Sequence, residues 1–279
     1  MLFTNEKINE NVTRIRDIAG TFIYLIEGSD KALLIDTGCG IGNLTEYVKT
    51  LTDKSIQVVL THGHVDHALG TNGFKEVYIS PKDKDIYTFH GTKECQAGYL
   101  NSLQVMGIDP SKLNISESDY MPIDSFDKFL PLNDGDTFEL GSVCVTVFAL
   151  EGHTPGSMVI LINELKMLIL GDAANDFTYL FDWSCPSVTK YKKNIKVLGK
   201  KVAGKYDRVL FSHGSGEGHP DMLNGVINVC DDIISGNVDN IPFKGFDNTP
   251  CFIAKAMNFE KFGRSDGGYG NIIYRPENI

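Results

Sequence analysis

The first third of the chain consists of short apolar runs separated by turn residues, a pattern typical of β-strands. Residues 21–28 (TFIYLIEG) and 31–37 (KALLIDT) predict a hairpin that turns at Ser29 and Asp30. Between residues 41 and 52 the apolar side chains recur at helical spacing instead, which predicts a helix. Further strands are expected at 57–60 (QVVL) and 76–80 (EVYIS).

Residues 82–128 interrupt this pattern, because they are more polar and combine helical stretches with a turn-rich piece. They predict a helical insertion over the core, or a lid, within a single domain that spans residues 1–279. Helices are expected again at 188–200 and 221–234. The remaining strands are expected at 137–140, 143–150, 157–162, 166–170 and 208–211, with extended segments at 251–257 and 271–274.

The order of these elements predicts the fold class. The strands fall into two groups, and each group is followed by helix. Two sheets packed face to face, with helices on the outside, would cover the apolar sides of both groups. We therefore expect an α/β protein of this kind, although other α/β arrangements share the same periodicities.

Composition and charge narrow the classes of partner. The chain has 279 residues, with 26 Lys and Arg against 36 Asp and Glu, and a net charge of −10. This balance argues against a nucleic-acid binder, which needs a basic face, and it equally disfavours docking on an anionic membrane. No apolar run approaches the roughly 20 residues that span a bilayer, and the N-terminus has no apolar signal core. We expect a cytoplasmic protein that acts on a small molecule. Its six cysteines, none in a CxxC pair, are expected to be reduced.

Three of the seven histidines fall in one segment, HGHVDH at 62–67, directly after an expected strand. His62 and His64 are two positions apart, so in extended backbone both rings project to the same side and can bind one ion. Asp66 and His67 begin the next element and can reach a neighbouring ion. Imidazole and carboxylate together suit Zn²⁺, Fe or Mn²⁺, and the segment therefore predicts a metal site.

Further candidate ligands stand where later strands end. His153 lies in the glycine-flanked turn GHTPG, and Asp172 and His213 each follow an apolar strand. Each of these residues, taken alone, is more often a hydrogen-bonded loop residue or a cap than a ligand. Their shared position at strand ends would bring them to one rim of the sheets, and this coincidence favours metal binding. His90 and His219 are interpreted as surface or supporting residues.

Together these segments resemble the metallo-β-lactamase-fold hydrolase superfamily. The matching pieces, in the family order, are Asp36 in LLIDTG, THGHVDH at 61–67, GHTPGS at 152–157, GDAA at 171–174 and SHG at 212–214. They cover the chain from about residue 20 to 235. The resemblance implies the family's fold, a four-layer αββα sandwich of two mixed β-sheets flanked by helices, with the metals at one edge.

The resemblance also implies a role for each matching residue. The expected ligands are His62, His64 and His153 for the first metal, Asp66, His67 and His213 for the second, and Asp172 as the bridge between them. Asp36 corresponds to a carboxylate behind the ligands, where it would orient a ligand or its loop by hydrogen bonding. The two divalent ions are expected to be Zn²⁺, with Fe or Mn²⁺ as the alternatives.

The chemistry that this site implies is hydrolysis. A hydroxide that bridges the two metals would be the nucleophile, and Asp66 would accept or shuttle a proton. The expected substrate is a small ester, lactone, thioester or related amide. The alternatives are a metal-dependent phosphodiesterase or nuclease, a glyoxalase II-type thioesterase, and a binding protein without enzymatic activity.

Substrate choice is expected to depend on the loops around the rim. An aromatic cluster after Asp172 forms either an apolar pocket wall or ordinary packing on the core, and the pattern favours neither. Its members are Phe177, Tyr179, Phe181 and Trp183. The insertion at 82–128 would roof the site or form a dimer contact, so a homo-oligomer stays open.

Overall fold

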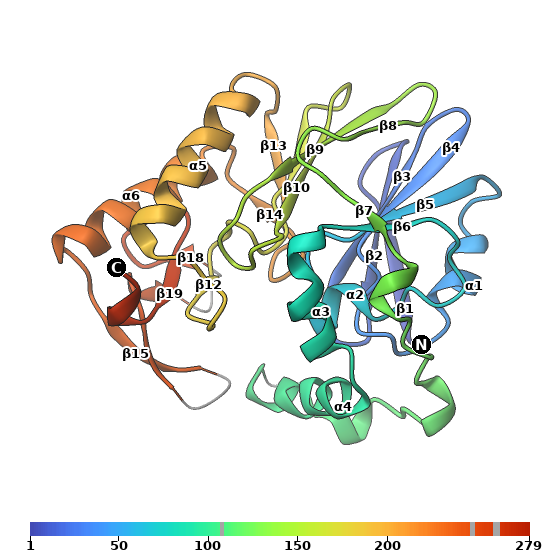
Figure 1. Ribbon diagram of the computed structural model, residues 1–279, viewed down its shortest axis with the longest axis horizontal. Coiled ribbons are helices and arrows are strands. Elements are labelled where there is room, and N and C mark those ends of the chain that lie inside the picture. Colours follow the sequence, from blue (N-terminus) through green and yellow to red (C-terminus); the bar gives the residue numbers. More distant parts are fainter. Residues whose placement is uncertain (107–108, 246–248, 259–262) are drawn as a thin grey trace. The chain divides into compact units, whose positions relative to one another are not determined.

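The computed structural model describes the chain except for residues 107–108, 246–248 and 259–262. The described chain divides into two units, Met1–Val145 and Thr146–Ile279. Each unit combines β-sheet with helices (Figure 1). Each unit carries part of the candidate ligand set.

A seven-stranded sheet forms the first unit, and its strands lie in the same order as along the chain. They are β1 (Phe3–Lys7), β2 (Val12–Asp17), β3 (Phe22–Glu27), β4 (Lys31–Ile35), β5 (Ser55–Val59), β6 (Val77–Ile79) and β7 (Leu130–Pro131). The first four pair antiparallel, whereas β4 to β7 pair parallel. The carboxyl ends of β4 and β5 therefore lie at one edge, where Asp36 and the segment 61–67 follow.

Two short helices pack on this sheet through apolar side chains. α1 (Leu44–Lys49) and α2 (Val65–Ala68) place Leu44 and Val65 in the same buried cluster as Ile23 and Leu34 of the sheet. α2 follows directly on His64, which stands at its N-cap position. The packing of α2 thus positions the histidine segment relative to the sheet.

The helix expected at 41–52 is shorter than its apolar pattern, because α1 spans only Leu44–Lys49. Gly42 has a φ of 85°, and the Asn43 side chain accepts a hydrogen bond from the Glu46 N–H, so the helix begins after these two residues. Ile41 is buried in a separate cluster with Leu100. Its apolar character therefore reflects packing outside the helix.

The segment at 82–128 contains two α-helices, α3 (Lys84–His90) and α4 (Lys93–Ser102). Gln96 of α4 is fully buried, and its Nε2 donates to the carbonyls of Cys39 and Gly40 at 2.7 and 3.2 Å. α4 is therefore docked on the loop after β4. Short 3-10 helices accompany them, namely η1 (Pro81–Asp83), η2 (Leu103–Met106), η3 (Pro110–Lys112), η4 (Glu117–Asp119) and η5 (Phe126–Lys128).

The second unit is built on a sheet whose strands lie in the order β14-β13-β11-β10-β9, and β8 continues this order beyond β9. The bounds are β8 (Thr137–Glu139), β9 (Cys144–Ala149), β10 (Met158–Ile162), β11 (Met167–Ile169), β13 (Arg208–Leu210) and β14 (Glu217–Gly218). β11 and β13 pair parallel. Their carboxyl ends therefore place the residues that follow, Gly171-Asp172 and Ser212-His213, at one edge.

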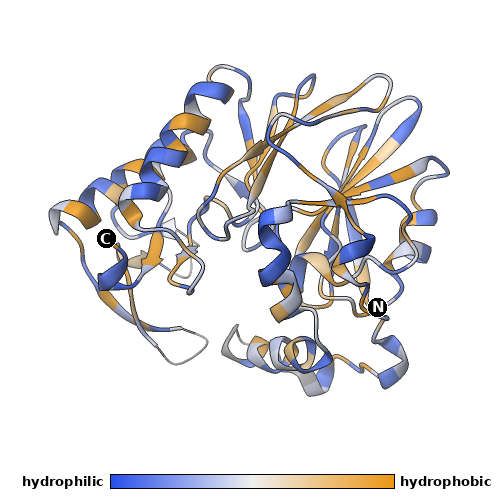
Figure 2. Ribbon diagram, in the orientation of Figure 1, coloured by the Kyte–Doolittle hydropathy of each residue, from blue (hydrophilic) through white to orange (hydrophobic). Residues whose placement is uncertain are grey.

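Two long helices, α5 (Val188–Val202) and α6 (Met222–Ser235), lie side by side in this unit (Figure 1). α5 buries Tyr191, Ile195 and Leu198 in one cluster with Leu161 and Leu168 of the sheet. Figure 2 shows hydrophobic strands in this unit and alternating hydrophobic and hydrophilic positions along α5. Such alternation is typical of a helix with one buried face.

The C-terminal part of the second unit forms a smaller sheet of order β12-β19-β16-β15 and a separate two-stranded pair. The strands of the smaller sheet are β12 (Thr178–Leu180), β15 (Ile241–Lys244), β16 (Pro250–Ile253) and β19 (Ile272–Tyr274), and the pair is β17 (Met257–Asn258) with β18 (Gly263–Arg264). Within the described ranges, no helix is long and apolar enough to cross a membrane.

Most of the expected elements are confirmed. The hairpin is formed by β3 and β4, in which Tyr24 stands opposite Ile35. The other strands expected between residues 57 and 211, and the helices at 188–200 and 221–234, lie within two residues of their predicted bounds. The pattern did not predict β1, β2, β7, β12, β14, β15 and β18.

Candidate functional site

Asp36 is a buried residue that is hydrogen-bonded to the histidine segment of the first unit and to the residue before it. It follows β4 with a φ of 64°, and it is 1% exposed. Its carboxylate accepts hydrogen bonds from the Thr61 N–H at 2.7 Å and from His67 Nδ1 at 2.8 Å. An imidazole that donates from Nδ1 keeps its lone pair on Nε2. The contact therefore leaves His67 Nε2 as the atom that can bind a metal.

Thr61 connects the same carboxylate to His62. The Thr61 hydroxyl lies 2.8 Å from Asp36 Oδ2 and 3.1 Å from His62 Nδ1. A hydroxyl has one hydrogen and an ionised carboxylate only accepts, so Thr61 donates to Asp36 and accepts from His62. The lone pair of His62 is then on Nε2, which lies 3.1 Å from Nδ1 of His64.

Asp66 lies in the first turn of α2 and is held by a tyrosine from α4. Its Oδ2 accepts a hydrogen bond from the Tyr99 hydroxyl at 3.1 Å and lies 3.5 Å from His67 Nε2. Burial raises the pKa of Tyr99 well above its ordinary value, and the charge of Asp66 raises it further. Tyr99 therefore keeps its proton at neutral pH and acts as a donor to Asp66.

The backbone of the histidine segment is fixed at Gly63. Its N–H donates to Oδ2 of the fully buried Asp83 at 2.8 Å. A Cβ at Gly63 would lie 3.0 Å from the backbone nitrogen of Tyr87, so a larger residue would have to displace α3. This fit holds the chain between His62 and His64 in one conformation.

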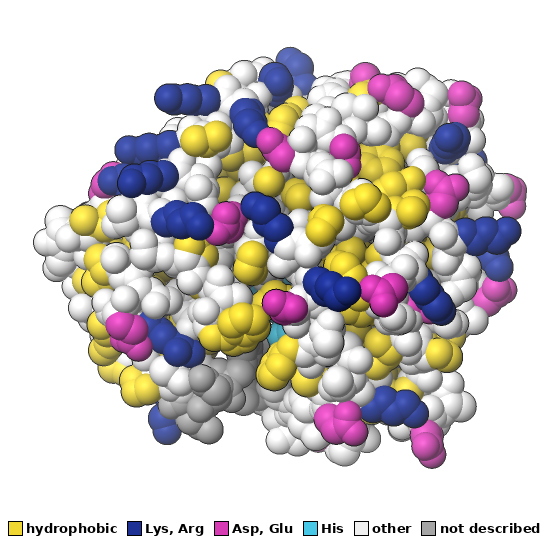
Figure 3. Space-filling model, in the orientation of Figure 1, with side chains coloured by type: hydrophobic (Ala, Val, Ile, Leu, Met, Phe, Trp, Pro, Cys, Tyr) yellow, Lys and Arg dark blue, Asp and Glu magenta, His cyan; other side chains and the backbone are white. Residues whose placement is uncertain are grey.

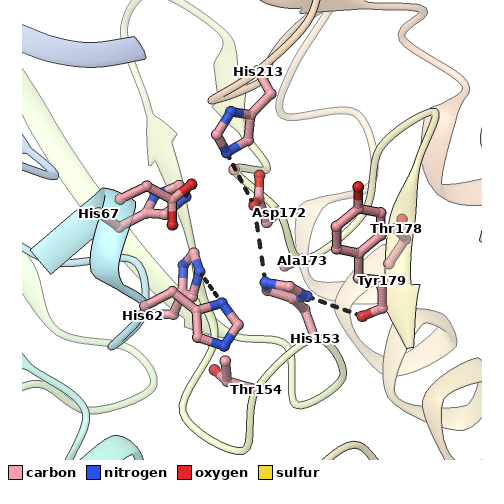
Figure 4. Close-up of polar contacts among 12 residues, drawn as sticks. His62, His67, His153, Thr154, Asp172, Ala173, Thr178, Tyr179 and His213 are labelled. Atoms are coloured by element: carbon pink, nitrogen blue, oxygen red, sulfur yellow. Dashed lines mark hydrogen bonds and ion pairs between the residues drawn. The ribbon is translucent and has the colours of Figure 1, made fainter. Parts of the chain in front are cut away.

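His153, in the second unit, is oriented by a main-chain carbonyl. It lies in the turn after β9, is 4% exposed, and donates from Nδ1 to the carbonyl of Tyr179 at 2.9 Å (Figure 4). Its lone pair is therefore on Nε2. The Cys185 thiol donates to the carbonyl of His153 at 3.3 Å, and burial raises the pKa of Cys185 to about 12, so this thiol stays protonated.

Asp172 lies close to the other two candidate ligands of this unit, His153 and His213. Its Oδ2 lies 3.2 Å from His213 Nε2 and 3.9 Å from His153 Nε2. The Asp172 side chain is 15% exposed and that of His213 is 34% exposed. One carboxylate oxygen thus lies near the lone-pair nitrogen of His153 and a ring nitrogen of His213.

Tyr191 contacts both the turn that carries His153 and the turn that carries Asp172. This fully buried residue of α5 donates from its hydroxyl to the carbonyl of Ala173. Its ring also covers Gly152, where a Cβ would lie 2.4 Å from a ring carbon. A side chain at Gly152 would therefore push the turn away from α5.

The aromatic cluster after Asp172 is divided between core and surface. Phe181 is 5% exposed and belongs to a buried cluster, against which Phe177 and Tyr179 pack. Trp183 is 64% exposed. Three of the four rings thus contribute to packing inside the second unit, and a role in a pocket wall stays a prediction.

The two remaining histidines have other surroundings. The ring of His90 lies 4.6 Å from that of His64. His219 stacks on Tyr269 at 3.7 Å, and its Nδ1 accepts a hydrogen bond from the Asp221 N–H at the start of α6. His219 therefore supports the start of a helix.

Sequence reasoning assigned no supporting role to four residues that contact the candidate ligands or their loops, namely Thr61, Asp83, Tyr99 and Tyr191. Only Thr61 had a signal, since it directly precedes the histidine segment. The other three come from elements well separated in sequence from the residues that they contact, and a tyrosine or aspartate there has no distinguishing pattern.

The family model of the metallo-beta-lactamase superfamily matches residues 16–213 of this chain. The acyl-coenzyme A thioesterase MBLAC2 of Homo sapiens is 29% identical over 178 residues, which are 58% of this chain and 60% of that protein. The Bos taurus protein of the same name is 28% identical over 173 residues, with the same two shares. The chain thus spans about three fifths of the length of these curated relatives.

Solved structures with low sequence identity share the fold. The sec-alkylsulfatase Pisa1 from Pseudomonas sp. has a TM-score of 0.64 and 14% identity, over 86% of this chain and 46% of that one. A metallo-beta-lactamase from Pontibacter korlensis has a TM-score of 0.55 and 20% identity, over 82% of this chain and 99% of that one. These likenesses confirm the predicted fold class, an α/β fold with mixed sheets and helices.

Proposed function

Because this chain belongs to the metallo-β-lactamase superfamily, we propose that it is a metal-dependent hydrolase of acyl-coenzyme A-type thioesters. The observation that carries the proposal is the orientation of the candidate ligands. His62, His67 and His153 each have Nδ1 engaged by an oxygen, which leaves Nε2 available to a metal. The choice of thioester rests on the curated relatives, which are named acyl-coenzyme A thioesterases.

The donor set fits two divalent ions, and zinc in particular. Two nitrogen ligands on one tetrahedral Zn²⁺ stand about 3.3 Å apart, given Zn–N bonds of about 2.0–2.1 Å. His62 Nε2 and His64 Nδ1 are 3.1 Å apart. We assign the ligands as His62, His64 and His153 for one ion, Asp66, His67 and His213 for the other, and Asp172 as the bridge. Iron and manganese accept the same nitrogen and oxygen donors.

The residues around the metals would orient groups and move protons. When bound, two divalent cations supply an activated water and polarise the carbonyl of the substrate. Asp66 receives a proton at its carboxylate and returns it to the departing sulfur, while the Tyr99 hydroxyl keeps that carboxylate in place. The oxygen of water joins the carbonyl carbon and the carbon–sulfur bond breaks, which yields a carboxylic acid and a thiol.

The proposal is tested with the full chain, stripped of metal and reconstituted with Zn²⁺, Fe²⁺ or Mn²⁺. Hydrolysis of an acyl-coenzyme A is followed by the loss of thioester absorbance. We expect turnover to require metal, and His153→Ala to lower both bound metal and turnover by at least about 100-fold. His219→Ala is the matched control, because this histidine contacts Tyr269 and the start of α6.

Two results would contradict the proposal. The first is a thioester hydrolysis rate that is the same with and without metal. The second is faster turnover of bis-p-nitrophenyl phosphate than of every thioester tested, which would favour a phosphodiesterase.

A further inference from the structure

One stretch of this acidic chain is strongly basic. Between residues 188 and 206 there are seven lysines and no aspartate or glutamate, whereas the whole chain carries a net charge of −10. This stretch is α5 and the residues that follow it. Figure 3 shows Lys and Arg side chains gathered over the part of the surface that α5 occupies in Figure 1. The concentration of charge makes this face locally attractive to anions.

Three of these lysines are not neutralised by a neighbour. Lys193, Lys196 and Lys200 are exposed and form no ion pair within the part of the chain that the structure describes. Two other lysines of the helix do, since Lys190 pairs with Glu151 and Lys192 with Asp231. Positions 193, 196 and 200 are three and four apart, so they form one stripe along α5.

Two lysines of this stripe, Lys196 and Lys200, line a groove between α5 and α6. The groove has a volume of about 620 Å³ and is lined by Lys196 and Lys200 together with Tyr206, Leu223 and Ile227. That volume is in the range of small-molecule sites, which are about 300–1,000 Å³. Ammonium groups together with an aromatic ring and aliphatic side chains suit a ligand that joins phosphate to a flat heterocycle.

The helices that form the groove are linked to two of the three candidate ligand loops of this unit, those of Asp172 and His213. α5 contacts the Asp172 turn through the hydrogen bond from Tyr191 to Ala173. Lys200 is nine residues further along the helix, roughly 14 Å at 1.5 Å per residue. α6 follows β14, which comes after the loop that carries His213 and pairs antiparallel with β13. A ligand in the groove would therefore need an extended arm to present a reacting group to these loops.

We propose that the α5–α6 groove binds the phosphorylated adenosine end of the coenzyme A thioester. Lys196 and Lys200 bind the phosphates, and the ring of Tyr206 contacts the adenine. The proposal rests on the function proposed above, and it adds the part of the substrate that is recognised. The pantetheine arm of coenzyme A separates the phosphates from the thioester. It is the extended arm that a ligand in the groove needs to reach the candidate ligand loops.

The test compares two substrates that share one acyl group, acyl-coenzyme A and the corresponding N-acetylcysteamine thioester, which has no nucleotide. In the double variant Lys196→Ala/Lys200→Ala we expect KM for acyl-coenzyme A to rise about 10- to 100-fold with little change in kcat. The N-acetylcysteamine thioester should be hydrolysed as by the unmodified protein. The control variant Lys7→Ala/Lys31→Ala makes the same change in charge in the first unit and should leave both substrates unaffected.

Direct binding of adenosine 3′,5′-bisphosphate, measured by calorimetry, separates this proposal from the proposed function. Binding that is lost in the double variant supports the groove even if no thioester is hydrolysed. Hydrolysis of both thioesters with an unchanged KM in the double variant would overturn it. A KM effect seen only with a thioester carried on an acidic protein would also overturn it, in favour of a protein-binding face.

Discussion

At the scale of single residues, Asp36 is hydrogen-bonded to two residues in and next to the histidine segment. Its φ of 64° is a conformation that aspartate and asparagine tolerate better than most residues, and its carboxylate contacts both Thr61 and His67. We expect Asp36→Asn to keep the backbone but lose one acceptor oxygen, which lowers metal affinity about 10- to 100-fold. Competition with a chromophoric chelator measures this affinity. Unchanged metal affinity in a folded variant would show that Asp36 only caps its loop.

Tyr99 allows a second test at this scale. We expect Tyr99→Phe to remove the hydrogen bond to Asp66 and to weaken metal binding by about 10-fold, with kcat lowered at saturating metal. Tyr87→Phe is the matched control, because the Tyr87 hydroxyl donates to the Asp124 carbonyl in the same unit. Equal losses in the two variants would indicate a general effect on packing.

These residues also show what a single sequence could predict about the site. The candidate ligands were visible because histidine is rare and each one stands at a strand end. Their hydrogen-bond partners were not, since Tyr99 is 33 residues from Asp66, and its contact depends on how α4 docks. The left-handed backbone of Asp36 has no signal in the sequence either.

At the scale of elements, prediction succeeded where one face is apolar. In α5 the buried residues Val188, Tyr191, Ile195 and Leu198 follow helical spacing, and the helix lies as expected. β1 was not predicted because four of its five residues are exposed, so its sequence FTNEK has no apolar alternation. β12 has only three residues within the aromatic cluster, which is too short for a period to appear.

The docking of α4 is testable at this scale. Gln96 is fully buried, and its Nε2 donates to two main-chain carbonyls. We expect Gln96→Leu to leave both carbonyls without that donor and to lower the free energy of unfolding by about 1–3 kcal/mol. Hydrogen exchange should become faster in α4 than in α3. Exchange in α4 that is already fast in the unmodified protein would instead favour a helix that opens as a lid.

At the scale of the whole molecule, the family resemblance predicted more than the periodicity of apolar residues did. Five short motifs placed the chain in a superfamily from about residue 20 to 235, and the family match at 16–213 confirms that placement. Net charge was informative only as an average. A value of −10 excluded a basic protein, but it concealed the lysine stretch at 188–206.

Stability as a function of pH is expected to depend on two aspartates with opposite shifts. Burial raises the pKa of Asp176. Two smaller effects lower it, namely the hydrogen bond that its carboxylate accepts from the Gly270 N–H at 3.0 Å and the charge of Arg264. A carboxyl group whose pKa is raised in the folded state contributes stability below its unfolded pKa of about 3.9. This contribution is lost as pH rises through the pKa of the folded state. Asparagine can still accept from Gly270 and has no charge. Asp176→Asn should therefore gain stability relative to the unmodified protein as pH rises from 4 to 7.

Asp266 should give the opposite slope. The hydrogen bond from Arg264 Nε at 2.9 Å is part of the contact that lowers the pKa of Asp266. The stability from this pair is present above the unfolded pKa of about 3.9 and is lost as pH falls through the lower folded value. Asp266→Asn should therefore be less stable than the unmodified protein at pH 7, and this deficit should disappear toward pH 3. Urea denaturation from pH 3 to 8 measures both variants. Parallel curves for the two would contradict the assignment, because burial and pairing shift the pKa of a carboxyl group in opposite directions.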